Sequence, residues 1–104
     1  MSNKAPKGET DVVTKTKQET KTPRQFKVLL HNDDYTTMEF VVWLLMNVFH
    51  HDQTSAHDIM LKVHRGGVGV AGTYSREIAE TKVAKTIQLA RQHDFPLEAS
   101  MEPE

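Results

Sequence analysis

Three consecutive polar residues, Asn32, Asp33 and Asp34, lie between an apolar segment and a segment with helical periodicity. One such side chain is enough to form an Asx turn or to cap a helix, and two adjacent carboxylates repel each other. Local structure therefore accounts for one of the acids and leaves the rest of the cluster for a functional role. The two acids could serve as an acid–base pair.

A histidine could join these acids. His64 extends the apolar stripe of the second predicted helix, one turn after Met60. A lone histidine in this position is most often a core-edge residue whose ring bonds to a carbonyl. With Asp33 and Asp34 it would instead complete a small metal- or acid-dependent hydrolase. No G-x-S-x-G motif and no three-ligand set with zinc-like spacing supports that alternative, so we expect no metal and no cofactor.

Residues 67–72 match the pattern G-x-G-x-x-G. In dinucleotide-binding folds this pattern follows a strand and opens a helix. Here a helical pattern precedes the glycines, and Val68, Val70 and Tyr74 alternate with small residues. The segment therefore predicts a strand with one face close to another backbone.

Apolar periodicity predicts the elements that position these side chains. The first helix begins with Thr36-x-x-Glu39, a capping box. The element order β-α-α-β-α-β predicts an α+β fold, a small three-stranded antiparallel sheet packed against three helices. The third helix carries its buried stripe on Ile78, Ala79, Val83, Ile87 and Ala90. The predicted elements are a strand over 26–31, a helix over 38–50, a helix from Asp52 or Thr54 to Gly66, a strand over 68–74, a helix from Ser75, and a strand over 97–101.

The composition divides the 104-residue chain into two parts. Residues 1–25 contain six Lys/Arg and three Asp/Glu with few large apolar side chains, which predicts a flexible N-terminal extension. Residues 26–104 contain seven basic and eleven acidic residues and form the predicted folded core. The net charge of −1 and the absence of cysteine favour a cytoplasmic protein that binds no nucleic acid. No apolar run approaches the ~20 residues that span a bilayer.

The folded part resembles the ClpS adaptor family in five segments, VLLHNDDYTTMEFVVWLL, IMLKVHRGG, GVGVAGTY, EIAETKVA and HDFPLEASME. The resemblance covers about residues 26 to 102. It implies a monomeric bacterial adaptor without catalytic activity. Such an adaptor binds N-degron substrates and delivers them to the AAA+ unfoldase ClpA and its partner protease ClpP.

The resemblance also implies roles for individual residues. The α-amino group of the substrate would contact Asn32, His64 and the Asp33–Asp34 pair, and the sequence does not decide between the two acids. The flexible extension would take part in delivery to the unfoldase. The implied pocket for the first side chain consists of Thr36, Met38, Val41, Met60, Val63 and Leu97. The implied surface for the N-terminal domain of the unfoldase consists of Glu77, Glu80 and Lys82.

The chemistry of these residues fits that role. A free α-amino group has a pKa of ~8, so it arrives as an ammonium with three donors for the amide, carboxylate and imidazole acceptors. An apolar pocket would accept Leu, Phe, Tyr or Trp, with micromolar affinity overall. One residue departs from the family: Thr37 stands where proline is usual, at the start of a helix, which could loosen the pocket rim next to Met38.

Overall fold

The computed structural model describes residues 23–104. Strand β1 (Gln25–His31) lies between β2 (Val68–Ser75) and β3 (Glu98–Pro103) in one sheet, and both pairings are antiparallel. Three helices complete the order β-α-α-β-α-β, so the predicted α+β fold is confirmed. The predicted extension lies outside the described residues except for its last three, and Gln25 already belongs to β1.

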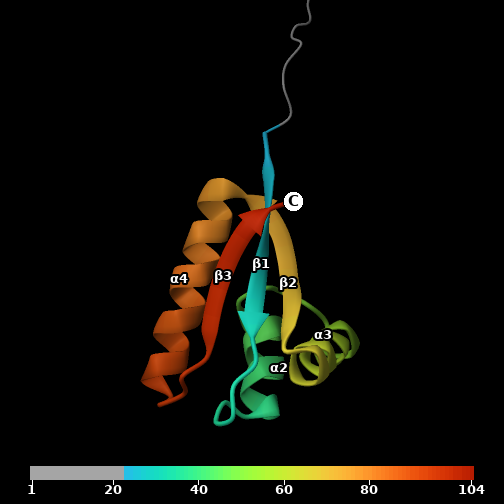
Figure 1. The fold of residues 1–104 in the computed structure, drawn as a ribbon, viewed down its shortest axis with the longest axis vertical. Helices are drawn as coiled ribbons and strands as arrows, with labels where there is room; N and C mark the ends of the chain where they lie inside the picture. Colours follow the sequence, from blue (N-terminus) through green and yellow to red (C-terminus); the bar gives the residue numbers. More distant parts are fainter. Residues whose placement is uncertain (1–22) are drawn as a thin grey trace, which may run out of the picture.

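The helices occupy two places around the sheet (Figure 1). Helix α4 (Arg76–Gln92) runs alongside the sheet and contacts all three strands. Helices α2 (Met38–Asn47) and α3 (Gln53–Gly66) pack against each other at the end of the sheet where β1 finishes. Within residues 23–104, no helix is both long and apolar enough to cross a membrane.

The first helix starts and ends differently from the prediction. Its N-cap is Thr37, whose hydroxyl accepts a hydrogen bond from the Phe40 amide at 3.1 Å, so the capping box that begins at Thr36 is wrong by one residue. The helix ends at Asn47 rather than at residue 50, because the chain turns through His50, whose φ is 61°. Of the two caps that the sequence allowed for α3, Asp52 and Thr54, the structure shows Asp52, which accepts a hydrogen bond from the Ser55 amide at 2.8 Å.

The core forms where α2, α3 and α4 meet the sheet. Two predictions about it fare differently. The glycine-containing segment is a strand, and a Cβ on Gly69 would lie 2.7 Å from Val63 Cγ2, so α3 approaches β2 closely. The predicted stripe of α4 is partly wrong: Ile78 is 50% exposed, whereas Thr86 is fully buried. The fully buried positions of α4 are the small ones that a close helix–sheet contact requires, Ala79, Thr86 and Ala90.

Candidate functional site

A cavity of about 580 Å³ opens at the end of β1. It lies between the loop 32–37, the first turn of α2 and the last turns of α3. Every predicted amine-binding and pocket residue except Leu97 lines it: Asn32, Asp33, Asp34, Thr36, Met38, Val41, Met60, Val63 and His64. Thr37, which the sequence analysis placed at the pocket rim, also lines the cavity. The sequence interpretation missed Tyr35 and Glu39, which line it too and lie within the same sequence segment.

Asp33 holds the loop that forms one wall of the cavity. Its Oδ1 accepts hydrogen bonds from the amides of Tyr35 and Thr36, each at 2.7 Å, and its Oδ2 accepts one from the Thr36 hydroxyl at 2.7 Å. Partial burial by itself would raise the pKa of Asp33, but these hydrogen bonds to Thr36 and Tyr35 outweigh it and leave the pKa below its usual value. Asp33 is therefore a fixed anion in the loop.

Asp34 differs from its neighbour. Its side chain is exposed, and within residues 23–104 it forms no hydrogen bond and no ion pair. The two acids of the cluster are thus divided between a carboxylate that organises the loop and one that faces solvent at the edge of the cavity.

Asn32 connects the end of β1 to the end of α3. Its backbone N–H donates a hydrogen bond to the carbonyl oxygen of Gly67, with an N···O distance of 2.9 Å. Its side-chain Nδ2 makes a longer contact of 3.5 Å with the carbonyl oxygen of His64. Asn32 lines the cavity, and its Oδ1 accepts no hydrogen bond from the described residues, so this oxygen is available as an acceptor.

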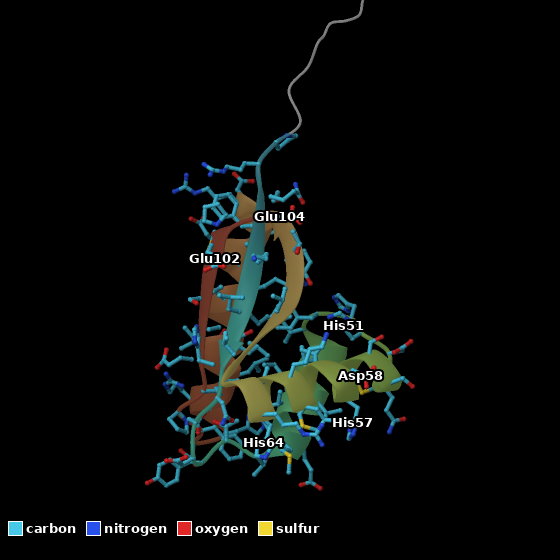
Figure 2. The ribbon with its side chains drawn as sticks, turned by 45° about the vertical axis from the view of Figure 1, so that its right-hand side comes forward. His51, His57, Asp58, His64, Glu102 and Glu104 are labelled. Carbon is cyan, nitrogen blue, oxygen red and sulfur yellow. The ribbon has the colours of Figure 1, made fainter. Side chains whose placement is uncertain are left out.

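His64 is an exposed residue in the last turn of α3, and Figure 2 shows it farther along that helix than His57 and Asp58. Its ring forms no hydrogen bond with any residue in the described part of the chain. The interpretation as a core-edge histidine bonded to a carbonyl therefore does not hold for His64. That description fits His51 instead, whose Nε2 lies 2.5 Å from the carbonyl oxygen of Ala71.

The other end of the cavity is apolar. Val41, Met60 and Val63 form its floor as part of the core, with exposed fractions of 6%, 5% and 2%. Met38 is 48% exposed and forms the rim. Leu97 does not line the cavity: it is 1% exposed and belongs to the core just before β3. The cavity thus joins a polar end with free acceptors to an apolar floor.

The predicted docking residues lie on α4 and do not line the cavity. Glu77 and Glu80 are exposed, and Glu80 pairs with Arg76 at 3.6 Å. Lys82 is half-buried, and its ammonium donates a hydrogen bond to the carbonyl oxygen of Val48 at 2.6 Å. Lys82 is therefore tied to the protein's own core, unlike the two glutamates.

The geometry does not support the alternative of a hydrolase that uses Asp33, Asp34 and His64. Both oxygens of Asp33 already accept hydrogen bonds from the loop, and its lowered pKa makes it a weak base. No three His, Asp or Glu side chains within residues 23–104 come together in a way that could hold a metal ion.

Comparison with known proteins identifies the family. The sequence model of the ATP-dependent Clp protease adaptor protein ClpS matches residues 21–100. The chain belongs to the ClpS family. A ClpS adapter protein from Desulfatibacillum aliphaticivorans is 57% identical over 94 residues, 90% of this chain and 90% of the relative. One from Myxococcus xanthus (strain DK1622) is 53% identical over 98 residues, 92% of each chain.

A solved ClpS structure has the same fold. Agrobacterium tumefaciens ClpS2 bound to L-phenylalaninamide is 40% identical to this chain and superposes with a TM-score of 0.77. The match covers 80% of this chain and 100% of that one. The resemblance seen in the sequence is thus confirmed, and the protein is a ClpS adaptor of the ATP-dependent Clp protease. A ClpS adapter serves the protease and is not itself the protease.

Proposed function

We propose that the cavity binds the first residue of a substrate protein, with the α-amino group at the polar end and a bulky apolar side chain on the floor. The observation that carries this proposal is the combination of free acceptors and an apolar floor in one cavity. The ligand of the A. tumefaciens ClpS2 structure supports it, because L-phenylalaninamide combines a free α-amino group with a phenyl side chain.

The ammonium has three donors, and the polar end offers acceptors for them. We assign the contacts to Asn32 Oδ1, a ring nitrogen of His64 and a carboxylate. Asp33 is the better candidate for the direct carboxylate contact, because its position is already fixed and its Oδ2 has a lone pair left. Asp34 adds negative charge nearby. An amide nitrogen inside a chain has neither the charge nor the spare donors, so only a chain start binds well.

The apolar part sets the preference for the first side chain. Burial of a Leu or Phe side chain against Val41, Met60 and Val63 contributes about 1.5–3 kcal/mol. Leu, Phe, Tyr and Trp carry their bulk from Cγ outward and can pass the rim at Met38. Val and Ile branch at Cβ and would collide with it. The resemblance also places Thr36 and Leu97 in the pocket. Thr36 shapes the pocket wall through its hydrogen bond to Asp33 in the loop. Leu97 supports the pocket from the core.

Delivery requires a second surface. We assign it to Glu77, Glu80 and Lys82 on α4, which would contact the N-terminal domain of a ClpA-type unfoldase, with the extension over residues 1–25 assisting. Because none of these residues lines the cavity, a substrate and an unfoldase can be bound at the same time. The adaptor is a monomer of the bacterial cytoplasm that catalyses no reaction and passes its substrate to ClpP through the unfoldase.

The deciding experiment compares two ligands on the full-length chain by calorimetry. Phenylalaninamide should bind with micromolar affinity, and N-acetyl-phenylalaninamide, which lacks the ammonium, should bind at least about 100-fold more weakly. Equal affinities would refute the proposal. In parallel, generic ester and phosphoester substrates with divalent metals should remain unhydrolysed, and turnover that is lost in Asp33→Asn would favour the hydrolase.

A further inference from the structure

Met38 is the most exposed methionine of residues 23–104. It is 48% exposed, whereas Met46 is 37% exposed, Met101 is half-buried and Met60 is only 5% exposed. Met38 lines both the cavity and a second hollow of about 520 Å³ between α2 and α3, so water reaches its side chain from two sides. Small molecules dissolved in that water therefore have access to Met38 without any movement of the fold.

The sulfur chemistry of the chain is confined to methionine, because the sequence contains no cysteine. Hydrogen peroxide transfers one oxygen atom to a methionine sulfur: the O–O bond breaks, an S–O bond forms, the sulfur loses two electrons, and water leaves. The product is methionine sulfoxide, which methionine sulfoxide reductases convert back with electrons from a thiol. The reaction replaces a flexible apolar side chain by a polar one, so its effect depends on what the side chain contacts.

We propose that Met38 is a reversible oxidation site, and that its sulfoxide weakens the binding of a bulky apolar first residue. This inference rests on the proposed function, because it concerns the same cavity. A side chain that reaches the floor at Val41, Met60 and Val63 passes the rim and covers part of Met38. The sulfoxide oxygen would then exchange water for an apolar neighbour, which is unfavourable. Hydroperoxides would thus reduce the uptake of chain starts until the sulfoxide is reduced again.

The test treats the full-length chain with hydrogen peroxide until peptide mass spectrometry shows Met38 converted to the sulfoxide while Met60 remains reduced. Calorimetry should then show an affinity for phenylalaninamide about tenfold lower than that of the untreated chain. Incubation with a thiol and both methionine sulfoxide reductases, one for each sulfoxide epimer, should restore the affinity. The melting temperature should change little, because the oxidised side chain lies at the rim and not in the core.

Two variants assign the effect to one sulfur. Met38→Leu keeps the rim apolar but cannot form a sulfoxide, so peroxide should leave its affinity unchanged, whatever its starting value. Met46→Leu removes the other exposed methionine of α2, which lies outside the cavity, and should retain the tenfold fall.

The untreated chain separates the failure of this inference from the failure of the proposed function. If it binds phenylalaninamide, four results would overturn the oxidation assignment and leave the cavity assignment standing: an unchanged affinity after conversion of Met38, a fall that persists in Met38→Leu, oxidation of Met60 before Met38, or unfolding on treatment. If the untreated chain does not bind phenylalaninamide, both assignments are overturned.

Discussion

The ammonium of Lys82 donates a hydrogen bond to the backbone carbonyl oxygen of Val48, 2.6 Å away. Val48 is the C-cap of α2, where carbonyl groups lack partners within the helix and a positive charge is stabilising. The same ammonium lies 5.3 Å from the ring centroid of Tyr74 and 5.9 Å from that of Phe49. Lys82 thus links α4, α2 and β2, in addition to any role in docking.

Lys82→Met should therefore destabilise the fold. Methionine retains the apolar part of the side chain but leaves the Val48 carbonyl without its charged donor, so we expect the free energy of unfolding to fall by about 1.5–3 kcal/mol. Urea unfolding followed by circular dichroism measures it. Lys85→Met, at an exposed position of the same helix, should change the stability by less than about 0.5 kcal/mol. Equal effects of the two substitutions would contradict a structural role for Lys82. Glu77→Ala is then the cleaner probe of unfoldase docking.

Asp33 should make the stability depend on pH. Its pKa is lower in the folded chain than in the unfolded one, so its contribution is fully present above about pH 4 and is lost as the pH falls through its folded-state pKa. Thr36→Val removes the hydroxyl that bonds to Asp33 Oδ2 and should raise the pKa of Asp33. A carbon-detected NMR titration of the Asp33 carboxyl in both chains tests this. An unchanged pKa in Thr36→Val would mean that the hydroxyl does not stabilise the anion.

His64 should contribute directly to ligand binding. If its ring accepts a hydrogen bond from the ammonium, His64→Ala removes one of the acceptors, and the affinity for phenylalaninamide should fall severalfold. Calorimetric titrations of the variant and the unmodified chain measure this fall. His57→Ala, on the same helix but outside the cavity, should leave the affinity unchanged. Equal affinities of His64→Ala and the unmodified chain would exclude His64 as the acceptor.

The fold should be about equally stable with Thr37 and with the proline that is usual at this position in the family. The φ of Thr37 is −75°, which a proline ring can adopt, and its hydroxyl caps α2. Thr37→Ala loses only the cap and should destabilise by about 1 kcal/mol. Thr37→Pro also loses the cap but restricts the unfolded chain, and the two effects should nearly cancel, within about 0.5 kcal/mol. Thermal unfolding ranks the three chains, and a Thr37→Pro chain less stable than Thr37→Ala would show that proline strains this loop.

Much of the fold could be predicted because local signals and apolar spacing agree. Asp52 caps a helix whose apolar stripe begins four residues later at Ala56, and Gly67, with φ of 88°, ends it. The loop residues of the site were predictable for a similar reason, since the Asn32–Asp34 cluster exceeds what a turn needs. Asp33 fills the turn role and Asp34 does not, a division that only the hydrogen bonds reveal.

The rest depends on packing that the sequence does not encode locally. Thr36 and Thr37 are equally good caps, and the choice falls to Thr37 because Asp33 engages the Thr36 hydroxyl. Helix α4 turns its small residues Ala79, Thr86 and Ala90 toward the sheet, where they allow close contact. Ile78 is exposed because this rotation of the helix points it away from the sheet. From the sequence alone, Lys82 is indistinguishable from an ordinary surface cation, because its hydrogen-bond partner Val48 is 34 residues away in the chain.

The bonds from Asp33 to Tyr35 and Thr36 have a kinetic consequence. Because the loop already has its hydrogen-bonded shape, a ligand does not have to wait for a rearrangement before it enters. Association should then proceed at rates limited by encounter, and differences in affinity among first residues should arise mainly from how fast each one leaves. If the cavity binds chain starts as proposed, the adaptor should sample many of them quickly and retain only those that dissociate slowly.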